Sequence, residues 1–110
     1  MVTALRLKTE LSKFADPMQK ENLQRFFKTG KGEYGEGDVF LGVKVPVQRR
    51  VVRNFYDMPL SEVKKLLASK VHEHRLCALL ILVHRFAHSN KQLQKKIFTF
   101  YLDHAHRVNN

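Results

Sequence analysis

The fold is decided by residues 72–88, which read HEHRLCALLILVHRFAH. The middle of this stretch, Leu76 to Val83, is a run of 8 apolar residues, far short of the roughly 18 that a membrane-spanning helix needs. A helix that is apolar almost all round has to be covered by other parts of the protein. We therefore predict a central, buried helix over 72–88, around which the other elements pack.

Apolar residues recur at helical spacing on both sides of this stretch. They predict helices at about residues 3–14, 17–28, 46–56 and 61–69, and a sixth helix that follows an N-cap at Asn90. The apolar stripes are Ala4, Leu7, Leu11 and Phe14; Leu23, Phe26 and Phe27; Val47, Val51, Val52 and Phe55; Val63, Leu66 and Leu67; and Leu93, Ile97, Phe100 and Tyr101. Asp16 and Pro17 have the residue types of an N-cap and a first helical position.

No stretch alternates between apolar and polar residues as a half-buried strand does. About six helices joined by short turns predict an all-α fold of stacked antiparallel pairs, as in an α-solenoid. A chain of 110 residues is the size of a single domain, which we place at residues 1–110.

All five glycines lie between positions 30 and 42, which predicts a Gly-rich connecting loop over residues 29–45. Residues 30–35 match G-x-G-x-x-G, the dinucleotide-binding pattern. That pattern binds a pyrophosphate when it follows a strand and opens a helix. Here a helix precedes it, and acidic side chains that repel phosphate lie around it, namely Glu33, Glu36 and Asp38. We therefore expect a connector and no dinucleotide site.

Metal and thiol chemistry are not supported by the sequence. His84 and His88 share a helix face, but no third ligand is evident beside them, so we expect no metal site. Cys77 is the single cysteine and is flanked by apolar residues, which disfavour the reactive thiolate. We expect it to be a buried, reduced thiol in an intracellular protein. Asp103 lies near His104, with no evident nucleophile beside the pair.

Positive charge is concentrated in the second part of the chain. The whole chain has a net charge of +10, and residues 39–110 contain thirteen basic and four acidic side chains. No acid lies between Asp38 and Asp57, and none between Glu73 and Asp103, where Arg75 and Arg85 also occur. Such runs favour phosphate contacts over an ordinary solvated helix face. The candidate DNA-backbone contacts are Lys44, Arg49, Arg50, Arg53, Lys91, Lys95 and Lys96.

Three segments together resemble one family: FLGVKVPVQRR at 40–50, FFKTGKGEYG at 26–35, and HEHR at 72–75 leading into Ala78 and Leu79. They are similar to the AlkD-type DNA alkylation-repair glycosylases. The resemblance implies HEAT-like helical pairs with a basic, concave surface for double-stranded DNA. It also implies excision of cationic N3- and N7-alkylated purines by hydrolysis of the N-glycosidic bond, with no metal or cofactor. By the same resemblance, Phe26 aligns with an aromatic residue that lies near the lesion.

This sequence also differs from the family in one respect. In the family, a Trp-Asp-hydrophobic-Val-Asp segment with the catalytic carboxylate follows a stretch like His106–Asn110, where this sequence stops. We therefore expect the N-terminal half of such a protein, a truncated solenoid without a catalytic residue of its own. We expect it to self-associate through its uncovered end, and to be cytoplasmic and nucleoid-associated when bound to DNA. The alternative is a non-catalytic HEAT-like module that binds nucleic acid or protein.

Overall fold

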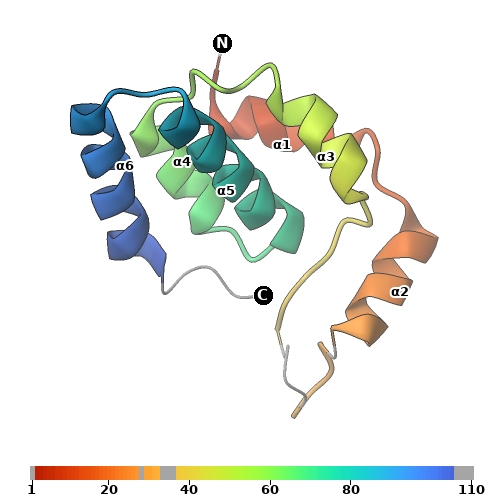
Figure 1. Cartoon of the computed structure of the whole chain (residues 1–110). Coiled ribbons are helices and arrows are strands. Elements are labelled where there is room, and N and C mark those ends of the chain that lie inside the picture. The colour runs from red at the N-terminus through yellow and green to blue at the C-terminus, as the bar shows by residue number, and fades with distance from the viewer. Residues whose placement is uncertain (1, 28, 33–36, 106–110) are drawn as a thin grey trace.

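The computed structural model of the chain describes residues 2–27, 29–32 and 37–105. These residues form six α-helices and no strand, which confirms the predicted all-α fold (Figure 1). The helices are α1 (Ala4–Ser12), α2 (Pro17–Phe26), α3 (Val45–Val52), α4 (Leu60–Leu67), α5 (His72–Ala87) and α6 (Lys91–His104). Within the described residues, the one contact of strand type is a single parallel bridge between Val39 and Val71.

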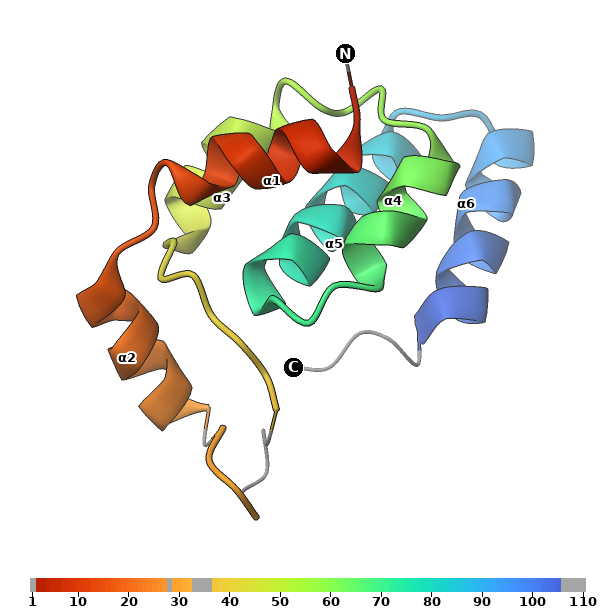
Figure 2. The ribbon, with the colours of Figure 1, turned by 180° about the vertical axis from the view of Figure 1, so that it is seen from behind.

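The helices are stacked in pairs, as the sequence predicts for a helical-repeat fold. α3 and α5 form one layer (Figure 1), and α1 and α4 form the layer behind it (Figure 2). α5 packs against α3, α4 and α6, so the helix predicted to be central is central. α6 lies at one end of the stack and α2 stands at the other, beyond α1 and α3 (Figures 1 and 2).

The core follows the predicted stripes most closely in α1, α3 and α4. All three stripe residues of α4 are buried, and α5 buries Cys77, Ala78, Ile81 and Leu82. The prediction that α5 is covered all round is wrong near its end, where Val83 is 67% exposed. α5 and α3 form one face of the stack. None of the described residues covers the side of α5 on which Val83 lies.

The stripes predicted for the two end helices are confirmed only in part, and Phe100 of α6 packs against the core. α2 has no buried residue, and Phe26 is 77% exposed. It is Phe27, just after the helix, that stacks on Phe40. In α6, Ile97 is buried and Leu93 and Tyr101 are exposed. An end helix has a neighbour on one side alone, so few of its apolar positions are covered.

Two helices begin where a side chain bonds the backbone N–H groups of the first turn. The Asp16 side chain accepts hydrogen bonds from the backbone N–H groups of Met18 and Gln19, and that of Asn90 accepts from Leu93, which confirms both predicted N-caps. α1 ends at Ser12, before the predicted Phe14, and Phe14 is half exposed. In the described part of the chain, no helix is long and apolar enough to cross a membrane.

Candidate nucleic-acid interface

Three arginines of the α3 region face solvent. α3 begins next to Pro46, whose fixed φ suits the first turn of a helix. Its inner face buries Gln48, Val51 and Val52, so the residues between them point outwards. Lys44, Arg49, Arg50 and Arg53 are all exposed, and we call them the α3 cluster.

The arginines of the α3 cluster differ from the other described arginines in having no bonded partner. None of the three takes part in an ion pair or a side-chain hydrogen bond among the described residues. The other four are engaged: Arg6 with Glu10 at 3.6 Å, Arg25 with Glu21 at 3.9 Å, Arg75 with Asp38 at 2.6 Å, and Arg85 with the carbonyl of Met58. Free guanidinium groups are available for a polyanion without breaking an internal contact.

Two arginines of the second acid-free run have structural roles. Arg75 is buried with its side chain 7% exposed, and it bonds both the Asp38 carboxylate and the Ser69 carbonyl. Arg85 donates to the Met58 carbonyl. Arg75 is therefore not available as a surface cation and Arg85 is partly buried, so this run contributes less positive surface than its sequence indicates.

The candidate lysines of α6 lie far from the α3 cluster. Lys91, Lys95 and Lys96 are exposed, and we call them the α6 cluster. α4 and α5 lie between α6 and α3 (Figures 1 and 2), in a molecule whose longest extent is 42 Å. The seven candidates therefore form two separate clusters. A ligand that touched both would have to reach across the α4–α5 layer.

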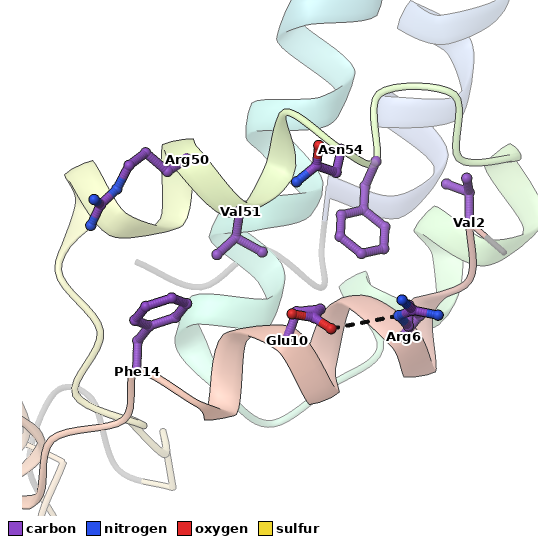
Figure 3. A pocket seen from close by; sticks show the side chains of 8 residues that line it. Val2, Arg6, Glu10, Phe14, Arg50, Val51 and Asn54 are labelled. Carbon is purple, nitrogen blue, oxygen red and sulfur yellow. Dashed lines mark ion pairs between the residues drawn. The ribbon is translucent and has the colours of Figure 1, made fainter.

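A groove of about 500 Å³ separates α1 from α3 (Figure 3). Val51 and Phe55 are its most buried lining residues. Polar side chains from both helices and two further apolar residues complete its lining: Arg6, Glu10, Arg50, Asn54, Val2 and Phe14. Arg50 lines this groove, whereas Arg49 and Arg53 do not. Glu10 is paired with both Arg6 and Lys13, so its charge is compensated.

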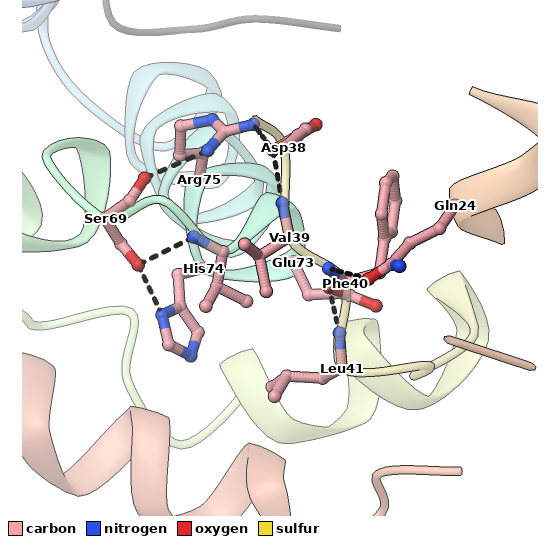
Figure 4. A network of polar contacts seen from close by, with 10 residues as sticks. Gln24, Asp38, Val39, Phe40, Leu41, Ser69, Glu73, His74 and Arg75 are labelled. Carbon is pink, nitrogen blue, oxygen red and sulfur yellow. Dashed lines mark hydrogen bonds and ion pairs between the residues drawn. The ribbon is translucent and has the colours of Figure 1, made fainter. Parts of the chain in front are cut away.

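A buried carboxylate joins two of the segments that the sequence singled out. Glu73, in the first turn of α5, is 1% exposed. Its carboxylate accepts hydrogen bonds from the backbone N–H groups of Gly42 at 2.9 Å and Val43 at 3.1 Å. It also accepts from that of Leu41 at 2.9 Å, a contact that Figure 4 shows. Residues 40–43 and 72–75 are thus one structural unit.

An ion pair and a histidine extend this network (Figure 4). Asp38 and Arg75 are each 7% exposed in their side chains and lie 2.6 Å apart. The Ser69 hydroxyl is hydrogen-bonded to Nδ1 of His74 at 2.8 Å. Burial, followed by the positive charge of Lys8, lowers the pKa of His74 to about 4. The Asp38–Arg75 pair holds the start of α5 against the residues that precede α3, and the Ser69–His74 bond joins the α4–α5 turn to α5.

Phe26, the candidate lesion-proximal aromatic, is solvent-exposed at the end of α2. Its ring packs edge-on against Phe27, with ring centres 5.1 Å apart. Phe27 lies in turn against Phe40 and His72, at 5.3 and 5.4 Å. The structure thus leaves Phe26 free for an external partner and holds its neighbour in a ring cluster.

The thiol of Cys77 is buried, as the sequence predicts. Cys77 is fully buried beside the side chain of Gln48, and burial raises its pKa to about 12. Among the described residues, no group of three or more His, Cys, Asp or Glu side chains is placed to hold a metal ion. His84 stacks on His88 and on Tyr56, with ring centres 4.1 and 3.5 Å apart. Residues 33–36 of the Gly-rich loop and His106 lie outside the described residues.

The structural roles of Glu73 and Asp38 do not follow from the sequence. In the sequence, Glu73 stands out as part of a segment similar to the family and Asp38 as an acid that repels phosphate. A signal was present, because a charged residue at the start of a strongly apolar helix needs a partner when it is buried. The sequence did not show which residues would supply that partner.

Comparison with protein families matches residues 7–110 to the family described as DNA alkylation repair enzyme. No curated protein and no solved structure matched the chain. The matched range includes α3, the buried Glu73 network and all but the first few residues of α1. The chain therefore belongs to the DNA alkylation repair enzyme family.

Proposed function

We propose that this chain is the scaffold and DNA-backbone-binding portion of a DNA glycosylase. That enzyme removes cationic N3- and N7-alkylated purines from double-stranded DNA, inside the cell and at the nucleoid. The family membership supports the repair role. The observation that carries the binding role is the α3 cluster, whose three arginines have no partner among the described residues.

Phosphate contact is the chemistry that best fits this cluster. A guanidinium group can form two parallel hydrogen bonds to one phosphate, and it keeps its charge at any physiological pH. Each phosphate that a protein neutralises on duplex DNA adds about 0.9 to the slope of log affinity against log salt. The α6 cluster supplies point charges at a second place, so both clusters contribute to affinity and neither reads bases.

We place no catalytic residue in this chain. Two buried carboxylates among the described residues already have structural partners, Glu73 in three backbone N–H groups and Asp38 in Arg75. Excision of a cationic base needs no metal or cofactor, because the alkylated base is already a good leaving group. It does need a carboxylate that stabilises the positive charge developing on the sugar. Phe26 is our candidate for an aromatic side chain beside the lesion.

Fluorescence anisotropy with a labelled duplex, measured at several salt concentrations, tests the binding role. We expect salt-dependent binding by the wild-type chain. The double variant Arg49→Glu with Arg53→Glu should bind far more weakly, with a salt slope smaller by about 2, because two phosphate contacts are lost. The matched control is Lys64→Glu with Lys70→Glu, which changes the net charge equally at exposed positions outside both clusters.

Equal losses in the two double variants would show that total charge governs binding, and would reject a specific role for α3. An affinity independent of salt would reject backbone binding altogether. Binding of a protein partner that survives the α3 double variant, with no DNA binding by the wild type, would favour the alternative of a protein-interaction module.

We further propose that the chain self-associates through α6. Phe98 and Leu102 lie four positions apart and are 53% and 56% exposed, so they form an apolar patch on one side of the helix. Sedimentation velocity should show an oligomer that Phe98→Glu dissociates. A monomer at high micromolar concentration would reject this proposal.

A further inference from the structure

α2 is attached to the protein by a neighbouring stretch of chain and has no core of its own. It has no buried residue. Its first turn instead meets Gly42, whose carbonyl accepts a hydrogen bond from the backbone N–H of Asp16 at 3.2 Å. At its other end, the Gln24 side chain accepts from the backbone N–H of Phe40 at 3.4 Å, and Phe27 stacks on Phe40. We call residues 38–44 the platform segment, because α2 rests on it.

The platform segment is in turn held by the start of α5. Its first residue, Asp38, is paired with Arg75 at 2.6 Å. The backbone N–H of Val39 donates to the Lys70 carbonyl at 3.3 Å, and the Val39 carbonyl accepts from His72 at 2.7 Å. Phe40 lies on the His72 ring, with centres 4.6 Å apart. The Glu73 carboxylate accepts hydrogen bonds from the next three backbone N–H groups, those of residues 41–43.

Glu73 is the member of this contact set with the most contacts to the platform segment. Its two carboxylate oxygens accept from three consecutive N–H donors, and Glu73 is only 1% exposed, so water has little access to replace a lost bond. Glutamine has the same shape but offers one oxygen and one NH₂ group. Its NH₂ group would face a backbone donor, so at least one of the three N–H groups would lose its acceptor.

We propose that Glu73 is a positioning residue that sets where α2, and with it Phe26, stands relative to the α3 cluster. The contacts run from Glu73 to the platform segment, from Phe40 to Phe27, and from Phe27 to Phe26. The part of this inference that concerns DNA binding rests on the proposed function. The placement of α2 itself does not depend on it.

The chain has no tryptophan, which allows a single reporter. In the Phe26→Trp variant, the emission anisotropy of the reporter measures how firmly the end of α2 is held, and this reading needs no DNA. Glu73→Gln in this background should lower the anisotropy, while far-UV circular dichroism retains the helical signal. With duplex DNA, it should weaken binding severalfold and reduce the change in reporter emission. The salt slope should stay unchanged, because the α3 cluster still meets phosphates.

Glu62→Gln in the same background is the matched control. Glu62 is also a carboxylate that accepts a backbone N–H, that of Ala4 at 2.9 Å, and it is paired with Lys65 at 2.7 Å. It belongs to α4 and does not touch the platform segment, so the reporter should not respond. Phe40→Leu is the second variant, in case Glu73→Gln fails to fold. It removes the ring between His72 and Phe27 and should free the reporter in the same way.

Unchanged reporter anisotropy in the folded Glu73→Gln variant, or in Phe40→Leu if that variant alone folds, overturns the inference. An equal fall in Glu62→Gln also overturns it, because the effect would then be general loosening. A wild-type chain that shows no DNA binding rejects the proposed function instead. The DNA-free anisotropy still decides the role of Glu73 in that case.

Discussion

Replacing Gly42 by alanine should displace the start of α2. Gly42 has a φ of +85°, a backbone conformation that residues with a Cβ rarely adopt. A Cβ at this position would lie 2.1 Å from the Asp16 carbonyl oxygen and 2.6 Å from the Lys20 nitrogen. Both are backbone atoms of the α2 region, which cannot rotate away as a side chain can. The substitution therefore forces α2 and the platform segment apart.

The expected cost has two parts. Alanine in the left-handed region costs roughly 1–2 kcal/mol, and the stiffer unfolded chain offsets about 0.4–1 kcal/mol of that. Separation of the two backbones adds the loss of the hydrogen bond from Asp16 to Gly42, worth about 1 kcal/mol. It also adds strain from repacking, of about 1–3 kcal/mol. We expect Gly42→Ala to lower the free energy of unfolding by about 3 kcal/mol.

Gly37 provides a matched control for this prediction. Its φ of +86° is nearly the same, and a Cβ built on it meets no atom of the described residues within 4 Å. Gly37→Ala should therefore cost about 1 kcal/mol, which is the backbone part alone. Urea unfolding followed by circular dichroism gives both values for the 110-residue chain. If the two variants cost the same, the contact between Gly42 and α2 does not contribute and the reasoning is wrong.

Two further predictions concern the buried network. Arg75→Met should lower the free energy of unfolding by about 3–5 kcal/mol, because it leaves the Asp38 carboxylate buried without its cation. Adding Asp38→Asn should restore part of that loss, and a double variant less stable in urea than Arg75→Met would contradict the pairing. Burial lowers the pKa of His74 to about 4, so the unfolded chain takes up the proton first as the pH falls. The stability that neutral His74 contributes should be complete above pH 6.5 and lost progressively between about 6.5 and 4. His72, whose pKa is also lowered chiefly by burial, acts in the same direction. An imidazole resonance of His74 that titrates near 6.5 in the folded protein would refute this.

Local features of the protein were readable from the sequence. The apolar positions of α4 followed from periodicity, because a helix places every third or fourth residue on one face. The central place of α5 followed from its continuous apolar run. The caps at Asp16 and Asn90 followed from side chains that bond the nearby backbone. The exposure of the α3 arginines followed in the same way from their place opposite a valine stripe.

Periodicity shows which face of a helix is apolar and says nothing about what covers it. The tertiary structure decided that Phe27 is packed and Phe26 exposed, since α2 stands at the end of the stack. It also decided that the basic residues form two clusters, because α4 and α5 lie between α3 and α6 (Figure 1).

The roles of the buried charges depended most on the tertiary structure. Arg75 reads as a surface cation in the sequence, yet it is paired with Asp38, which lies 37 positions away. Glu73 finds its three donors 30 to 32 positions away, in the loop before α3. A charge is stable inside a protein when specific partners meet it there. Only the packing of the platform segment on the first turn of α5 brings those partners together.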